Sequence, residues 1–278
     1  MSEVQSVTRR VILFSKKDPA SMTVKSALTE NFGFTESDEV IFGNGVIRLG
    51  EVLGVTTNSE ALFLSDAELR SLNSRLIVVA YRHRSEKGVN ALLVHATGNW
   101  GSNSELGGLP NEVSYSMAGA LRAALFTLLE ESAANKSLEG WHVGFEATHH
   151  GPFSSTPLLF VEYGGTENAL NDRDAAQAVA SACISAVNAR EAEIAHIGIG
   201  GSHYAPKFTK MSIEDRLAFG HIIPEYVFPT DLSMIRTAYD RVVEAKKLAV
   251  IDWKGLRGEH RRSVIEALER SGIEYVRS

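Results

Sequence analysis

Histidines and acidic residues gather in five short polar segments, four of which contain glycine. The segments span Tyr81–Ser85, His95–Gly101, Glu146–Pro152, Glu162–Glu167 and Gly198–Lys207. Imidazole nitrogens and carboxylate oxygens can bind a divalent metal ion. A histidine beside a carboxylate can instead exchange protons near neutral pH without a metal. A single histidine after a strand is more often an ordinary loop residue, but five such segments together indicate a functional site.

Four histidines and one carboxylate are the groups with the most chemistry to offer: His95, His149, His150, His203 and Glu162. We interpret His149, His150, Glu162 and His203 as candidate catalytic residues. All five are candidate metal ligands, and zinc is the ion that we consider. The chain has no His-Glu-x-x-His helix, so a standard metalloprotease site is excluded. A zinc site and a metal-free histidine–carboxylate pair therefore both stay open.

A glycine-rich loop offers a second kind of chemistry. Gly198-Ile199-Gly200-Gly201 follows a predicted strand and could present backbone N–H groups to an anion, although a tight turn is the simpler interpretation. His203 stands where a dinucleotide-binding loop would have its third glycine, so that motif is excluded. Lys207 favours phosphate contact, and Arg82 and Arg84 form another local positive cluster.

Apolar runs alternate with helical stripes along the chain, which predicts a mostly parallel or mixed sheet with helices on both sides. The expected fold class is therefore a three-layer α/β/α architecture. Predicted strands span 10–14, 76–81, 91–95, 141–148, 158–163, 194–199 and 248–252. Predicted helices span 21–31, 117–131, 173–190, 232–247 and 262–270. Open α/β sheets bind ligands at the carboxyl ends of parallel strands, so we expect the polar segments to converge there.

The strand predicted over 141–148 carries several polar side chains on one face. Its alternation places His142, Gly144, Glu146 and Thr148 together, opposite the apolar residues. If the extended backbone continues, His149 and His150 point to opposite sides. Only one of them would then enter the site.

We expect one α/β domain over residues 1–278. Residues 40–66 read as a small β excursion within it, with Asn44-Gly45 as a hairpin turn. Cys183 lies on the apolar stripe of the helix predicted over 173–190, so we expect it in the core. The basic run that includes Arg257 and Arg262 is interpreted as the solvated start of a helix.

Charge and composition exclude several classes of protein. The chain has 278 residues, with 28 basic and 34 acidic side chains and a net charge of −6. This balance argues against a DNA-coating protein but allows a local basic patch. No apolar run approaches the roughly 18 residues needed to span a bilayer, and the first residues do not resemble a signal peptide. Because a single cysteine can make no internal disulfide, we expect a cytoplasmic protein with no membrane partner.

Two unusual strings resemble the archaeal and plant type of D-aminoacyl-tRNA deacylase. They are Thr148-His149-His150-Gly151-Pro152 and Gly200-Gly201-Ser202-His203-Tyr204-Ala205-Pro206. His95-Ala96-Thr97-Gly98-Asn99, Phe160-Val161-Glu162 and Lys254-Gly255-Leu256 match as well, so the resemblance extends from about Tyr81 to Leu256. The chain departs from the family pattern around Arg82-His83 and at Ser202, which concerns the shape of these loops.

The resemblance implies a hydrolase that cleaves the ester between a D-amino acid and tRNA, a proofreading reaction. It also implies a zinc cofactor, a monomer, and a fold related to the phosphorylase and peptidyl-tRNA hydrolase group. The partner would be the acceptor end of D-aminoacyl-tRNA. The residues that would bind this substrate are Arg82, His83, Gly98, Asn99, Gly200, Gly201, Tyr204 and Lys207.

Other functions fit the same residues. A peptidyl-tRNA hydrolase or a zinc exopeptidase would use the histidines and Glu162 on an amide, and a nucleoside phosphorylase would use the glycine loops and basic residues on phosphate. A protein that binds nucleotides or tRNA ends without catalysis would use the histidines only for stacking and hydrogen bonds.

Overall fold

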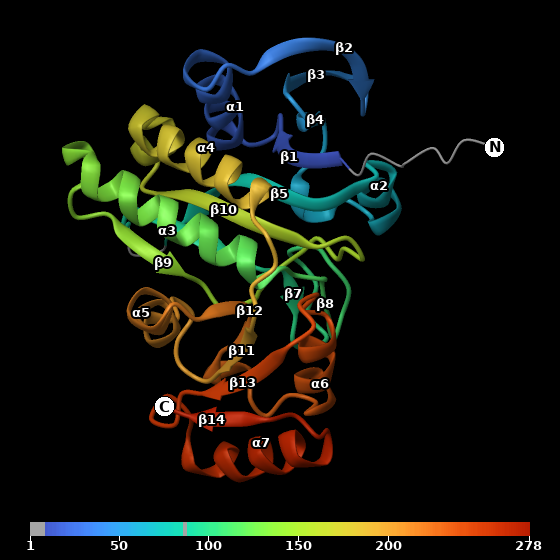
Figure 1. Cartoon of the computed structure of the whole chain (residues 1–278), viewed down its shortest axis with the longest axis vertical. Helices are drawn as coiled ribbons and strands as arrows, with labels where there is room; N and C mark the ends of the chain where they lie inside the picture. The colour runs from blue at the N-terminus through green and yellow to red at the C-terminus, as the bar shows by residue number, and fades with distance from the viewer. Residues whose placement is uncertain (1–8, 86–87) are drawn as a thin grey trace.

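The computed structural model describes residues 9–85 and 88–278, so the residues on which the signal-peptide expectation rests are mostly outside the description. Its centre is an eight-stranded sheet in the order β2-β3-β4-β1-β5-β10-β6-β9 (Figure 1). The strands are β1 (Arg9–Ser15), β2 (Thr35–Ile41), β3 (Asn44–Leu49), β4 (Val52–Thr57), β5 (Ser74–Arg84), β6 (Ala91–His95), β9 (His142–Phe145) and β10 (Leu158–Gly165).

The direction of the strands changes in the middle of this sheet. β4, β1, β5 and β10 are parallel, whereas β6 pairs with β10 in the antiparallel sense and β9 is parallel to β6. The central strands β1, β5, β6 and β10 are almost continuous apolar runs, because both faces of the sheet are covered there. The predicted mixed sheet, and with it the α/β fold class, is confirmed.

Three long helices cover one face of the main sheet: α1 (Pro19–Asn31), α3 (Ala118–Ala134) and α4 (Arg173–Asn188). Asp18 and Asp172 cap the first turns of α1 and α4 by accepting backbone N–H bonds, which fixes where these helices begin. The apolar stripes of the three helices form one core with the inner face of the sheet, and Cys183 is buried in it as expected. The other face is partly covered by η1 (Ala61–Phe63) and α2 (Asp66–Ser71).

The C-terminal part of the chain builds a second sheet, which the sequence did not predict. Its order is β12-β11-β13-β14 and all four strands are parallel. The elements here are β11 (Ala195–Ile199), α5 (Pro206–Asp215), β12 (Ala218–Ile223), η4 (Glu225–Val227), α6 (Ser233–Asp240), β13 (Lys247–Ile251), α7 (Gly258–Arg270) and β14 (Tyr275–Arg277). β12 and α5 were missed, since Gly220 and His221 interrupt the apolar run and α5 is largely polar. The helix predicted over 232–247 ends at Asp240.

The two sheets join where β9 leaves the main sheet. Glu146 N still donates to Val94 O of β6, at 3.1 Å. After Glu146 the chain bonds to the second sheet and its loops: Ala147 N donates to His203 O at 2.7 Å, and Thr148 N donates to Ile222 O at 2.9 Å. The strand predicted over 141–148 is therefore too long at its carboxyl end. The segment that bears His149 and His150 lies between the sheets.

The remaining elements are short. They are β7 (Gly98–Asn99), β8 (Glu112–Val113), η2 (Lys136–Leu138) and η3 (Asn168–Asn171). Strands β2 and β3 form the expected hairpin, but the turn is Phe42–Gly43, where both residues have positive φ angles, and not Asn44-Gly45. β4 joins this hairpin to β1 in the main sheet. A single domain over the whole chain stays a prediction. None of the described helices is long and apolar enough to cross a membrane.

Candidate active site

The site forms on the face of the main sheet opposite the three long helices. Glu162 lies in β10, next to Val161 and Tyr163, which point into the helix-covered core. By the same alternation, His83 of β5 and His95 of β6 share the face of Glu162. Register brings them together, since Phe160 is opposite His95 and Gly164 is opposite His83. The expected convergence at the carboxyl ends of parallel strands holds for His83 and Glu162, because β5 and β10 are parallel. It does not hold for His95, because β6 runs antiparallel to β10.

His149 and His150 both enter this site, contrary to the expectation that only one could. Their rings lie 4.2 and 4.8 Å from the His95 ring, measured between centroids. The backbone does not stay extended: His150 has a φ of 42°, and Gly98 N donates a 2.7 Å bond to its carbonyl. This turn aims the second imidazole at the same place as the first.

Three of the histidines have one ring nitrogen fixed by a backbone carbonyl. The Nδ1 atoms of His95, His149 and His150 lie 3.1, 2.8 and 2.6 Å from the carbonyl oxygens of Ala96, Ala147 and Gly151. A carbonyl only accepts, so each Nδ1 carries the proton. In each ring Nε2 is therefore the nitrogen left to bind a metal ion or a carboxylate, as in histidine ligands of metals.

Two buried carboxylates face these rings. Glu162 Oε1 lies 3.3 Å from His95 Nε2 and 3.7 Å from His150 Nε2, and its Oε2 lies 3.8 Å from His83 Nδ1. Glu146 Oε1 lies 3.0 Å from His203 Nε2 and 3.7 Å from His83 Nδ1. Glu146 was not among the site residues predicted from the sequence, although the alternation along 141–148 places it on the polar face.

Burial and the neighbouring charges set the protonation of the cluster. Burial alone would raise the pKa of Glu162, but the imidazoles of His150, His83 and His95 beside it hold that pKa well below its usual range. Burial lowers the pKa of His149 well below its ordinary value, and the neighbouring imidazoles add to this effect. Glu162 is thus an ionised acceptor and His149 a neutral ring at neutral pH.

For His83 and His95 the balance is reversed. Burial would lower the pKa of each imidazole, but Glu162 and Glu146 outweigh it, so both pKa values are raised. The site therefore combines two carboxylates with imidazoles whose pKa values shift in opposite directions. The pKa values of His83 and His95 are raised, and that of His149 is lowered.

Several buried atoms of the site have no hydrogen-bond partner within residues 9–85 and 88–278: His95 Nε2, both carboxylate oxygens of Glu146, and Glu162 Oε1. Buried polar atoms are normally paired, so these orphaned atoms are suitable ligands for a cation. The side chains form three overlapping groups whose candidate ligand atoms lie within 4.8 Å of one another: His95, His149 and His150; Glu146, His149 and His203; and His83, Glu146 and Glu162. Imidazole and carboxylate donors suit zinc.

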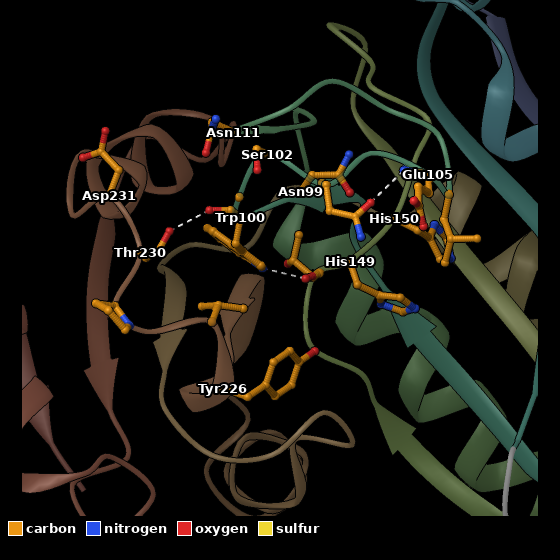
Figure 2. Close-up of a pocket in the computed structure, with 17 residues that line it drawn as sticks. Asn99, Trp100, Ser102, Glu105, Asn111, His149, His150, Tyr226, Thr230 and Asp231 are labelled. Atoms are coloured by element: carbon orange, nitrogen blue, oxygen red, sulfur yellow. Dashed lines mark hydrogen bonds between the residues drawn. The ribbon is translucent and has the colours of Figure 1, made fainter.

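A cavity of about 860 Å³ opens beside His149 and His150 (Figure 2). Asn99 and Trp100 line it from one loop, and Tyr226 and Asp231 from another. The Tyr226 hydroxyl lies 3.0 Å from His203 Nδ1, which links the cavity to the cluster. Nothing in the sequence singled out Tyr226.

The residues predicted to bind substrate fall into different places. Asn99 lines the cavity, where its Nδ2 donates to Gly107 O at 2.8 Å. The Tyr204 hydroxyl lies 3.4 Å from Nε2 of His83. Lys207 is in the first turn of α5. Arg82 turns to Asp18 and Glu60, at 3.6 and 3.3 Å, and its side chain is 14% exposed.

The three predicted glycines act through backbone shape. Their N–H groups donate to protein carbonyls: Gly98 to His150, Gly200 to Ile223 and Gly201 to Gly255. These groups are therefore not free for an anion. All three have positive φ angles, and a Cβ at Gly98 would lie 2.5 Å from Val113. Glycine at these positions lets the loops approach the site closely.

Comparisons with known proteins identify the family. The family model of D-aminoacyl-tRNA deacylase matches residues 70–276. A D-aminoacyl-tRNA deacylase of Pyrococcus furiosus is 38% identical over 275 residues, covering 96% of this chain and 99% of the relative. One of Thermococcus onnurineus is 38% identical over 278 residues, with the same coverage.

A solved structure shares the fold of the whole chain. It is a crystal structure of a conserved protein of unknown function, with a TM-score of 0.86 and 26% sequence identity, and the match covers 97% of this chain and 95% of that one. The expected family resemblance is confirmed over nearly the full length. The chain belongs to the D-aminoacyl-tRNA deacylase family.

Proposed function

We propose that this protein hydrolyses the ester bond of D-aminoacyl-tRNA, releasing the free D-amino acid and tRNA. Membership of the family supports the substrate class. The observation that carries the proposal is the cluster of orphaned Nε2 and carboxylate atoms beside an open cavity. Ester hydrolysis needs a water that loses a proton, and these atoms can bind the water and accept the proton.

Glu146 is the proton acceptor in this proposal. Both its oxygens are buried without a hydrogen-bond partner among the described residues. It faces two imidazoles, those of His203 and His83, whereas Glu162 faces three. Glu146 is also 2% exposed, and a carboxylate in such surroundings interacts strongly with charge that develops beside it. Glu162 keeps His95 and His150 in place.

We also propose zinc as the cofactor. His95, His149 and His150 would hold the ion through their Nε2 atoms, because the backbone carbonyls have fixed the required tautomer in all three. When bound, zinc would lower the pKa of a water and polarise the ester carbonyl. A protein set of three ligands is typical of catalytic zinc sites, which keep a position open.

The test compares four substrates: D-tyrosyl-tRNA, L-tyrosyl-tRNA, an N-blocked peptidyl-tRNA and a free dipeptide. We expect hydrolysis of D-tyrosyl-tRNA at least tenfold faster than of the other three. Preference for the peptidyl-tRNA or the dipeptide would overturn the proposal in favour of an amide hydrolase. Binding of tRNA without any product in zinc-supplemented protein would identify a non-catalytic binder.

A second measurement addresses the cofactor. Elemental analysis should find zinc in the purified protein, and chelation should abolish hydrolysis until zinc is restored. Full activity in protein freed of metal would instead favour a metal-free histidine–carboxylate pair. We propose that the protein is a monomer, and size-exclusion chromatography tests this.

A further inference from the structure

A short basic segment stands out in an otherwise acidic chain. Residues 254–262 contain Lys254, Arg257, Arg261 and Arg262 but a single acidic residue, Glu259, whereas the chain as a whole has a net charge of −6. The segment covers the loop after β13 and the first turns of α7, in the red part of Figure 1. The sequence alone favoured a solvated helix start. The position of this segment in the structure suggests that it also binds a ligand.

We infer that this surface binds phosphates of the tRNA acceptor stem while the aminoacylated 3′ end lies in the cavity. We call it the basic surface and define it as Lys254, Arg257, Arg261, Arg262 and Arg277. The inference rests on the proposed function for its substrate, and it adds the place where the RNA is held.

The basic surface is organised around one tryptophan. The guanidinium carbons of Arg261 and Arg277 lie 4.8 and 4.7 Å from the centre of the Trp253 ring. Cation–π contact of this kind holds a guanidinium plane while leaving N–H donors at its edge. Lys254, Arg262 and Arg277 are exposed. The surface thus presents several cations to solvent, two of them held against the indole.

The basic surface starts at the rim of the cavity. Arg257 Nε lies 3.1 Å from Oε1 of Glu225, the neighbour of Tyr226. Gly201 N donates to Gly255 O at 3.0 Å, and Glu225 N donates to Gly201 O at 2.9 Å. The loop that carries His203, the loop that carries Tyr226 and the start of the basic surface are therefore bonded to one another.

Carboxylates line the cavity, which indicates that the phosphates of the RNA lie outside it. Apart from the histidines, the ionisable residues among its described lining are Glu105 and Asp231, with Tyr226 neutral at pH 7. Carboxylates repel a phosphodiester, so the aminoacyl group, which carries an amine and no phosphate, fits the cavity better than the RNA backbone does. Arg82 does not bind these phosphates, since its side chain is only 14% exposed and pairs with Asp18 and Glu60, whereas Arg257 is 70% exposed beside Glu225. The adjoining basic surface does, through contacts that need no particular base.

Charge reversal tests the inference. The double variant Lys254→Glu/Arg262→Glu is compared with Lys136→Glu/Arg173→Glu, which makes the same change in net charge at exposed positions on η2 and α4. Each protein is assayed on D-tyrosyl-tRNA and on the D-tyrosyl ester of adenosine, which carries the reacting bond and no phosphate. Binding of tRNA that carries no amino acid is measured at several salt concentrations, and circular dichroism checks the fold.

For the basic-surface variant we expect kcat/KM on D-tyrosyl-tRNA to fall tenfold or more, with the adenosine ester hydrolysed as before. Its binding of tRNA that carries no amino acid should weaken. The slope of the logarithm of the binding constant against the logarithm of the salt concentration should be smaller in magnitude by roughly two. The η2/α4 variant should keep most of its activity on both substrates. Equal losses in the two variants, or equal losses on both substrates, would overturn the inference. A protein that hydrolyses neither substrate contradicts the proposed function instead, and the tRNA-binding arm still decides the inference.

Discussion

Glu146 and Glu162 differ in what surrounds them, although both are buried carboxylates of the same cluster. Glu162 faces His95, His150 and His83, which hold it ionised. Glu146 Oε2 has no hydrogen-bond partner among the described residues and is free to accept a proton. In the proposed function Glu162, which faces three imidazoles, positions its neighbours, and Glu146 accepts the proton. The two residues therefore give different expectations on substitution.

Glu146→Gln keeps the size of the side chain but removes its ability to accept a proton. We expect kcat on D-tyrosyl-tRNA to fall by about 10² or more, the range that general-base catalysis supplies. Glu244→Gln is the matched control, because Glu244 is equally buried but bonds to the backbone of α3 away from the cluster. Retention of more than a tenth of the wild-type kcat in Glu146→Gln would contradict the role of this residue.

Tyr226→Phe removes the one hydroxyl that bonds His203 Nδ1 from the cavity side. Burial, with the charge of Glu146, raises the pKa of Tyr226 to about 12, so the hydroxyl keeps its proton at neutral pH. Loss of a hydrogen bond of about 1 kcal/mol predicts roughly a fivefold lower kcat with little change in KM. Steady-state kinetics beside Tyr275→Phe, a surface control, check this; an unchanged kcat would show that His203 needs no partner.

At the scale of elements, β12 and the segment after β9 depend on each other. His221 of β12 is buried, and its Nε2 lies 3.0 Å from Ser114 O while its Nδ1 lies 3.1 Å from Thr148 Oγ1. Thr148 directly precedes His149, so the position of the histidine pair depends on a strand more than 70 residues away. Periodicity along 141–148 could predict the polar face but not this partner.

The same residue predicts an acid sensitivity. Burial lowers the pKa of His221 to about 3, whereas an unfolded histidine titrates near 6.5. Between these values the unfolded state binds more protons, so the free energy of unfolding falls as the pH drops below about 6.5. At pH 5 the loss from His221 is about 2 kcal/mol, and above pH 7 it vanishes.

Urea unfolding of the wild type and of His221→Asn at pH 7.5 and pH 5 measures this contribution. Because asparagine does not titrate, the variant should lose about 2 kcal/mol less than the wild type between the two pH values, even if it is less stable at both. The same pH-dependent loss in both proteins would show that His221 does not stay neutral in the folded state.

The whole molecule places its site between two sheets. The main sheet supplies His83, His95 and Glu162, and the loop after β11 supplies His203. A ligand that bridges these parts stabilises the folded state, because it binds nothing comparable in the unfolded chain. The distribution of charge is also a property of the whole molecule: the net charge is −6, and the basic surface lies at the rim of the cavity.

Removal of zinc should therefore lower the melting temperature. With free zinc at a hundredfold excess over its Kd, binding adds about 3 kcal/mol, which corresponds to several degrees for a chain of this size. Calorimetry with and without a chelator measures the shift. His149→Ala, which removes a ligand candidate shared by two groups, should respond little to the chelator. Identical melting of the wild type in both conditions would argue against a structural contribution of the metal.

The sequence by itself determined most of the strands and helices, the family and most of the residues of the cluster. It could do so because apolar periodicity and short motifs are local properties. Only the tertiary structure decided how these residues meet. His83 and Glu162 lie near the carboxyl ends of the parallel strands β5 and β10, whereas His95 joins them from β6, which is antiparallel to β10. His150 turns to join His149 because its backbone takes a left-handed conformation held by Gly98, some fifty residues earlier. Strand direction and such backbone turns depend on contacts between distant segments, which no local pattern records.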